Sequence, residues 1–258
     1  MGFFGKLFEK KECAICGGEI GLLGNRKLED GNMCKKCAAK LSPWFSDRRS
    51  STIAQIEEQL AYREANREKV AAFRPTRTLG EDTKLLLDED NNCFVVTDAR
   101  DLAADNPDVV NCADVTGCEL DIDENRRELT REGKDGKQIS YNPPRYEYSY
   151  NFYVEISVNH PYFDSMRFRI NDSSVEITPP PGRGGPGGFR PGMNAEYRRY
   201  QQMGEEIKRE LMAERRQARD EVASAAAPKA AVTCPYCGAT TTPDASGCCE
   251  YCGGAVNG

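Results

Sequence analysis

The sequence predicts a multidomain α+β protein. We expect a treble-clef-like zinc finger followed by a helix, a central small antiparallel β barrel or sandwich with a C-terminal helix, and a C-terminal zinc ribbon. Eight of the twelve cysteines form four C-x-x-C pairs, two pairs near each end of the chain. Between them, residues 76–178 hold several short segments in which apolar and polar residues alternate, the pattern of half-buried strands.

The paired cysteines indicate metal binding rather than disulfide or redox chemistry. Disulfides need an oxidising compartment, and the N-terminal residues lack the long apolar region of a secretory signal. A redox C-x-x-C needs a surrounding βαβ pattern, which the sequence does not show. Each C-x-x-C turn delivers two thiolates to a tetrahedral zinc ion. We therefore predict two structural zinc ions, held by Cys13, Cys16, Cys34 and Cys37 and by Cys234, Cys237, Cys249 and Cys252.

Four cysteines remain outside these sets. Cys248 directly precedes Cys249 and competes with it as a ligand, but only Cys249 keeps the C-x-x-C spacing. The other three are Cys93, Cys112 and Cys118, which lie in the central region. Buried free thiols are common in protein cores, so we expect these three to be core residues. The alternative, a third metal site, would need a carboxylate ligand.

The N-terminal residues predict a metal-stabilised finger joined to a helix. About thirty residues cannot bury a sufficient core, so the metal must contribute folding free energy. We expect Ile20, Leu22 and Leu23 to form a small hairpin and the Cys34 pair to open a helix. Thr52-Ile-Ala-Gln55 is a capping-box pattern. The predicted segments are a finger at 1–49 and a connecting helix at 50–75.

The central region predicts strands and then one helix, together spanning 76–221. The longest alternation puts apolar residues at every second position from Tyr146 to Val158, which indicates a long, bent or bulged strand. A Pro/Gly loop at 179–193 precedes the helix, which is expected from about Asn194. Its apolar stripe is Tyr197, Tyr200, Met203, Ile207 and Leu211. A linker at 222–232 and a ribbon at 233–258 complete the chain.

The first module resembles a known bacterial family. The residues are Cys13-x-x-Cys16-Gly-Gly-Glu-Ile-Gly and Leu28-x-Asp30-Gly31-x-x-Cys34-x-x-Cys37, and the likeness covers residues 12–73. The family is a Firmicutes-type zinc-finger domain of unknown function. The C-terminal pairs resemble a generic zinc ribbon, and the order of strands and helix is similar to a pleckstrin-homology or GRAM-like domain. The resemblance implies zinc-binding modules at both ends of the chain, and it implies no particular role because the family has no settled function.

Local charge narrows the classes of function. The chain has a net charge of -6, but residues 74–178 hold 12 basic and 22 acidic side chains, whereas residues 1–50 hold 10 basic and 6 acidic ones. The acidic average argues against wholesale binding to phosphates. The basic residues near the first finger keep nucleic-acid binding open as an alternative. They are Lys35, Lys36, Lys40, Arg48 and Arg49, beside the aromatic residues Trp44 and Phe45.

We expect a non-enzymatic, cytoplasmic interaction or adaptor protein with a protein partner. The sequence offers no catalytic residue, no organic cofactor site and no phosphate-binding loop, and the single histidine, His160, is expected in a solvent-facing turn. No run of 18 apolar residues is present. Membrane association is a further alternative, either through a short amphipathic N-terminus that carries Phe3, Phe4, Leu7 and Phe8 or through lipid binding by the PH-like β domain. The sequence leaves the oligomeric state open.

Overall fold

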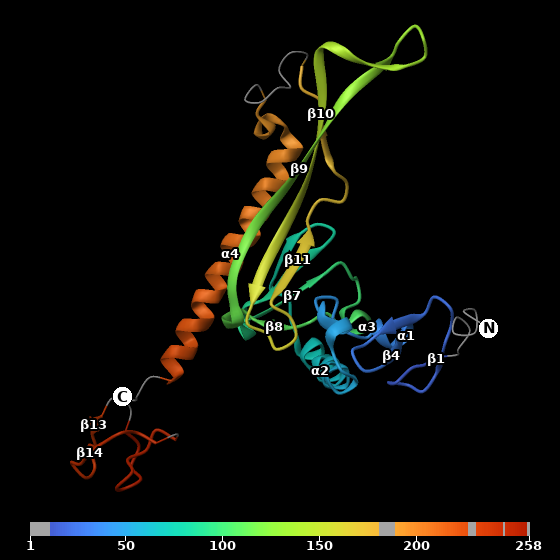
Figure 1. The fold of residues 1–258 in the computed structure, drawn as a ribbon. Coiled ribbons are helices and arrows are strands. Elements are labelled where there is room, and N and C mark those ends of the chain that lie inside the picture. The colour runs from blue at the N-terminus through green and yellow to red at the C-terminus, as the bar shows by residue number, and fades with distance from the viewer. Residues whose placement is uncertain (1–10, 181–188, 227–230, 245, 257–258) are drawn as a thin grey trace. The chain divides into compact units, whose positions relative to one another are not determined.

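The chain folds into two compact units, Met1–Arg216 and Gln217–Gly258. The computed structural model describes residues 11–180, 189–226, 231–244 and 246–256. Figure 1 shows the order of the elements, which are helices and small antiparallel sheets. The predicted amphipathic N-terminus and most of the Pro/Gly loop lie outside the described residues.

The N-terminal module contains two hairpins and a short helix. The hairpins are β1 (Lys11–Glu12) with β2 (Glu19–Ile20) and β3 (Asn25–Lys27) with β4 (Asn32–Cys34), and the helix α1 (Lys35–Ala38) follows. The expectation for the leucines was wrong. Leu22 and Leu23 lie in the turn after β2, with 86% and 92% of their surfaces exposed. The module's small core instead contains Ile20, Leu28, Met33 and Leu41.

Helix α2 (Ile53–Ala72) joins this module to the rest of the unit. The predicted capping box is confirmed, with the Thr52 and Gln55 side chains each bonded to the other residue's backbone. Ile56, near the start of the helix, packs into the core of the N-terminal module. Val70, near its end, packs with Val95 and Val109 of the central region. One helix therefore contributes to two cores.

The first sheet of the central region has the strand order β5-β6-β7-β8. Its strands are β5 (Arg77–Gly80), β6 (Lys84–Asp88), β7 (Cys93–Thr97) and β8 (Val110–Asn111), with the short helix α3 (Leu102–Asp105) between the last two. The predicted alternation holds at Leu85 and Leu87 of β6, but in β7 the residues Phe94, Val95 and Val96 are all buried, so both faces of that strand are covered. Leu85, Leu87 and Phe94 are fully buried, whereas Leu86 and Cys93 pack with the cluster at the end of α2.

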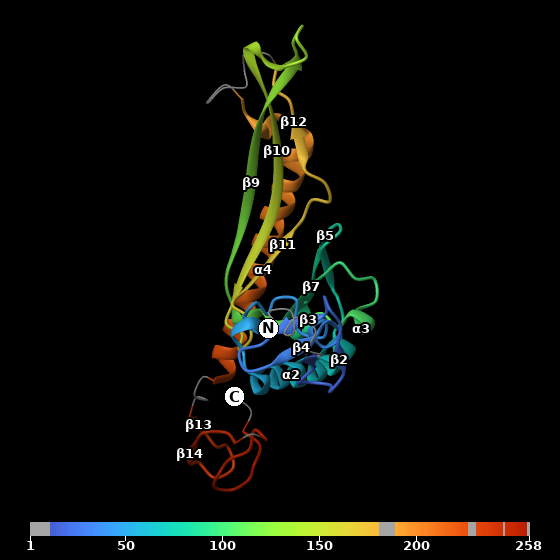
Figure 2. The same ribbon diagram turned by 45° about the vertical axis from the view of Figure 1, so that its right-hand side comes forward.

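The second sheet is built around one long strand. β10 (Gln138–Val158) pairs with β9 (Val115–Glu132) on one side and with β11 (Ser165–Arg169) and β12 (Val175–Ile177) on the other. Figures 1 and 2 show β9 and β10 side by side along their length. One register shift lies between Ser140 and Arg145, before the stretch in which a bend or bulge was predicted, and a second lies inside that stretch, between Ser157 and Val158. The inward positions from Tyr148 to Val158 are buried, as the alternation predicted.

The expectation of a barrel was wrong. In a closed barrel every strand has a neighbour on both sides, but the strands among residues 76–178 that the structure describes form two separate open sheets. β9 and β10 span 18 and 21 residues and run past the short strands β11 and β12 that pair with β10. None of the described strands of the first sheet pairs with this second sheet, so neither sheet closes.

Helix α4 (Ala195–Ala226) contacts both sheets. Tyr197 packs edge-on against Tyr150 and Phe152 of the second sheet, and Glu210 forms an ion pair with Arg77 of the first. The predicted stripe is confirmed at Tyr197, Tyr200, Ile207 and Leu211, which are buried. The helix continues to Ala226, so the first part of the predicted linker is helical. None of the described helices is long and apolar enough to cross a membrane.

The second unit contains a small cysteine-rich fold. Beyond the end of α4 it has one short hairpin, β13 (Val232–Thr233) with β14 (Thr240–Thr241). Its buried cluster consists of Cys234, Cys249 and Val256, with Val232 packed against them. With so little apolar surface buried, this unit cannot be held together by a hydrophobic core alone.

Candidate metal centres

The structure brings Cys13, Cys16, Cys34 and Cys37 together. Their sulfur atoms all lie within 4.8 Å of one another. Cys13 follows β1, and a tight turn closed by a 2.8 Å hydrogen bond from the Gly17 N–H to the Cys13 carbonyl presents Cys16 beside it. Gly17 has a φ of 67°, which glycine adopts without strain. Cys34 ends β4 and caps α1, whose single turn carries Cys37.

Backbone amides point at the sulfur atoms of this cluster. The Cys34 N–H donates to Sγ of Cys13 at 3.2 Å, and the Cys37 N–H donates to Sγ of Cys34 at 3.3 Å. Burial raises the pKa of the Cys13 thiol, but the amides of Cys34, Cys16 and Ile15 outweigh it and lower the pKa to about 6. Burial and the neighbouring cysteines raise the pKa of Cys37 to about 12. Four thiolates at this spacing would repel one another, so a bound cation would stabilise the deprotonated cluster.

The second cluster repeats one turn twice. Cys234, Cys237, Cys249 and Cys252 also have all their sulfur atoms within 4.8 Å of one another. In each turn the first cysteine's carbonyl accepts from a glycine with positive φ, at 2.9 Å from Gly238 and 2.8 Å from Gly253. Sγ of Cys234 lies 3.6 Å from that of Cys252, and Sγ of Cys237 lies 3.7 Å from that of Cys249.

The sulfur spacing fits zinc. A tetrahedral ion with Zn–S bonds of about 2.3 Å holds its sulfur ligands ~3.8 Å apart, close to the 3.9 Å between Cys16 and Cys34 and the two distances in the second cluster. Soft thiolate ligands select zinc over magnesium or calcium. Each cluster can hold one zinc ion with four protein ligands, which leaves no open position for a substrate.

Cys248 lies outside the second cluster. Its sulfur faces the Ser246 carbonyl at 3.8 Å, and its backbone bridges to Ala255. We expect Cys248→Ser to retain both zinc ions and Cys249→Ser to retain one, as measured by elemental analysis of the purified variants. Loss of an ion from the Cys248→Ser variant would contradict this assignment.

The three central thiols form no metal-ligating group among the described residues. Cys112 and Cys118 are buried and Cys93 is half-buried. Burial raises the pKa of Cys93 to about 11 and those of Cys112 and Cys118 to about 12, so all three stay protonated at neutral pH. We expect a thiol reagent at pH 7 to modify Cys112 and Cys118 only after denaturation, and rapid labelling of either residue in the native protein would contradict their burial.

His160 is less exposed than the sequence predicted. Its ring stacks on Phe163 with centroids 4.0 Å apart and meets Tyr62 edge-on at 5.1 Å. It contributes to a cavity of about 590 Å³ beside Phe45 and Ser46. Burial lowers the pKa of the imidazole. The expected solvent-facing turn residue is therefore a half-buried, aromatic-packed one.

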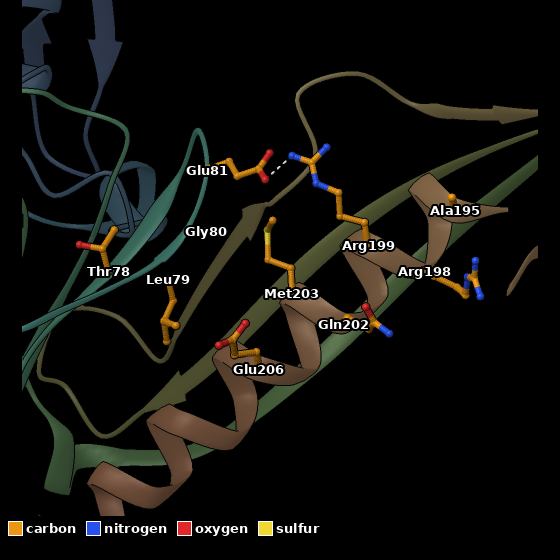
Figure 3. Close-up of a pocket in the computed structure, with 10 residues that line it drawn as sticks. All are labelled: Thr78, Leu79, Gly80, Glu81, Ala195, Arg198, Arg199, Gln202, Met203 and Glu206. Carbon is orange, nitrogen blue, oxygen red and sulfur yellow. Dashed lines mark hydrogen bonds and ion pairs between the residues drawn. The ribbon is translucent and has the colours of Figure 1, made fainter.

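A second cavity, of about 540 Å³, lies between the β5–β6 turn and the first half of α4. Figure 3 shows an ion pair between Glu81 and Arg199 across it, with Met203 beside them and Arg198 pointing away. No cysteine or histidine lines this cavity. The charged residues among those that line it are Glu81, Arg198, Arg199 and Glu206, two acidic and two basic.

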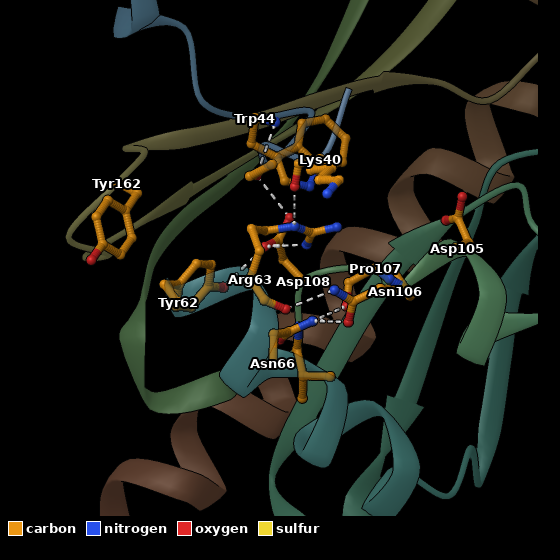
Figure 4. A network of polar contacts seen from close by, with 12 residues as sticks. Lys40, Trp44, Tyr62, Arg63, Asn66, Asp105, Asn106, Pro107, Asp108 and Tyr162 are labelled. Carbon is orange, nitrogen blue, oxygen red and sulfur yellow. Dashed lines mark hydrogen bonds and ion pairs between the residues drawn. The ribbon is translucent and has the colours of Figure 1, made fainter. Parts of the chain in front are cut away.

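The sequence reasoning missed a buried polar network between α2 and the residues before β8. Ser42, Tyr62 and Arg63 all bond the Asp108 carboxylate, and we call these four residues the Asp108 network (Figure 4). The Arg63–Asp108 distance is 2.8 Å, and the Asp108 side chain is fully buried. Asn66 extends the contact by accepting from the Val109 N–H at 3.0 Å. The network ties the N-terminal module and α2 to the first sheet.

Taken together, the clusters define a protein with two four-cysteine sites that could each hold a metal ion. Residues 11–59 match a family described as Domain of unknown function (DUF4428). That match covers the first cluster and the start of α2. No curated protein and no solved structure matches the chain.

Proposed function

We propose that the chain is a non-enzymatic, zinc-stabilised interaction protein. The observation that carries the proposal is that each metal centre is built from four cysteines, which favours a structural rather than a catalytic ion. On this proposal the first module is a treble-clef-like finger and the second a zinc ribbon.

The finger offers an apolar contact for a protein partner. Leu22 and Leu23 are adjacent, almost fully exposed and flanked by Gly21 and Gly24. A pair of exposed leucines is unfavourable in water unless another surface covers it. We propose this turn as the principal contact of the finger.

The two alternatives have weaker support. Trp44 and Phe45 are half-buried, so they do not present free faces on which bases could stack. Arg48 donates to the Lys27 carbonyl at 2.7 Å and so is held against the finger. The apolar turn suits a lipid surface as well as a protein, and the experiment below separates the two.

The test compares the full chain with a Leu22→Ser/Leu23→Ser variant. We expect a protein partner captured by the wild type to be lost by this variant and retained by Met193→Ser, which removes another apolar side chain that is 81% exposed. Sedimentation with anionic vesicles and a gel shift at low salt are run alongside. Leucine-dependent binding to vesicles, or a shifted nucleic-acid band, would replace the protein-partner proposal.

A further inference from the structure

Among the residues that the structure describes, one edge of strand β9 lies beside no other strand, and we call it the free edge. β10 pairs with β9 from Val115 to Glu132, and in the part of the chain that the structure describes no second strand pairs with β9. A free edge presents unpaired backbone N–H and C=O groups, which are a template for another strand. Proteins usually cover or shorten such an edge, yet β9 is 18 residues long. The edge is therefore suited to pairing with a partner strand.

The charges along β9 change from acidic to mainly basic at Asn125. Residues 119–124 carry only acidic charges, and residues 126–131 carry mainly basic ones. The acidic side chains are Glu119, Asp121, Asp123 and Glu124, and the charges after Asn125 are Arg126, Arg127, Glu128 and Arg131. A strand that is acidic on one side of its midpoint and basic on the other complements its own reversed copy.

We propose that β9 pairs with β9 of a second copy of this chain, antiparallel, about a two-fold axis at Asn125. The axis stands perpendicular to the joined sheet, so each side chain meets one on the same face. In this register Glu124 lies opposite Arg126 and Asp123 lies opposite Arg127. Glu119 and Arg131 form a third pair, further from the axis. Because of the two-fold symmetry, each pair occurs twice in the dimer. Cross-strand pairs of opposite charge stabilise a sheet.

Neighbouring registers are worse. An axis at Glu124 places this carboxylate opposite its own copy, and an axis at Arg126 places two guanidinium groups together and Glu124 opposite Glu128. Like charges directly opposite each other destabilise a sheet. With the axis at Asn125, no like charges are opposite between residues 119 and 131. The charge order therefore selects one register.

Contacts within the chain hold these side chains in place. Arg127 bonds Glu147 on β10, and the Arg126 guanidinium lies 4.9 Å from the Tyr146 ring centre. Glu124 accepts from the Tyr150 hydroxyl at 3.0 Å. Such preorganisation lowers the entropy lost on pairing. Lys208 contacts Glu119 at 2.6 Å, and Arg167 lies 3.7 Å from Asp123. The two central pairs lie nearest the two-fold axis and are therefore the better test.

A second copy fits this edge better than a nucleic acid does. A nucleic acid that followed β9 would meet four carboxylates before Asn125, and its phosphates would be repelled there. A reversed copy meets the opposite charge in both halves. The protein surface that complements β9 is therefore β9 itself.

Two variants test the register. Arg126→Glu/Arg127→Glu makes the centre of β9 wholly acidic, and Asp123→Arg/Glu124→Arg makes it wholly basic. We expect the wild type to have twice the 28.7 kDa mass of one chain by light scattering at low salt. Each variant alone should be monomeric, and an equimolar mixture should form a heterodimer, because every central pair is then complementary.

The control is Arg145→Glu, which reverses a charge on β10 opposite Leu129 and away from the free edge. It should remain dimeric, and circular dichroism with zinc analysis should show that all variants are folded. A monomeric wild type, dimers formed by either variant alone, or a mixture that stays monomeric would overturn the proposal. A wild type that remains monomeric but shifts an oligonucleotide would assign the edge to nucleic acid instead.

Discussion

Cys13→Ser is expected to unfold the N-terminal module and to release one zinc ion while the second ion stays bound. Cys13 is almost fully buried and its sulfur accepts a backbone hydrogen bond from Cys34. Structural zinc contributes about 10–16 kcal/mol to the folding of small zinc-binding domains. Without the ion, the buried side chains of this module are too few to hold it.

Hydrogen exchange measured by mass spectrometry checks this result. Amides of β3 and β4 should lose protection in the Cys13→Ser variant, whereas those of β10 should keep it. Cys118→Ser is the matched control, because it changes a buried thiol outside both clusters and should retain two ions and full protection. A Cys13→Ser protein with unchanged exchange and two ions would contradict the metal assignment.

Asp108→Ala is expected to destabilise the first unit by about 3–5 kcal/mol, because it leaves the charge of Arg63 buried without its partner. The loss is large since Ser42 and Tyr62 also give up their bonds to the carboxylate. Urea unfolding followed by circular dichroism measures the change in the free energy of unfolding.

A second variant distinguishes two contributions to this loss of stability, the unpaired charge of Arg63 and the loss of packing. Replacing both partners, as Arg63→Met/Asp108→Leu, should cost less than Asp108→Ala alone, because no buried charge is left unpaired. Asp105→Ala, at an exposed neighbouring position, should change the free energy of unfolding by about 0.5 kcal/mol or less. Equal losses for Asp108→Ala and the double variant would refute the idea that the unpaired charge dominates.

The local features of the fold were predictable from sequence because they depend on spacing. Thr52 and Gln55 form the capping box three residues apart, and the alternation from Tyr148 to Val158 is the register of β10. The C-x-x-C spacing likewise placed two sulfur atoms in each turn. In each case the partners are neighbours in the chain, so one sequence contains the whole signal.

The open sheets and the Asp108 network were not predictable in this way. Alternation identifies strands but not their partners, and the pairing of the described strands of the central region gives two open sheets. Arg63 and Asp108 are 45 residues apart, and charged residues are usually exposed. One signal was present, since Arg63 and Asn66 continue the helical stripe between Ile56 and Val70.

The exposed leucines show a different limit. Leu22 and Leu23 are apolar, which favoured a buried hairpin, but the turn after β2 places both in solvent. The signal that could have corrected this is the pair of flanking glycines, which favour a turn over a strand.

The most direct test is the metal content of the purified full chain by elemental analysis. Two four-cysteine clusters predict two zinc ions per chain. We expect to find two zinc ions. We also expect a chelator to remove both ions and both modules to lose their structure as a result. A folded protein with no bound metal would contradict the claim that zinc stabilises the two cysteine-rich modules.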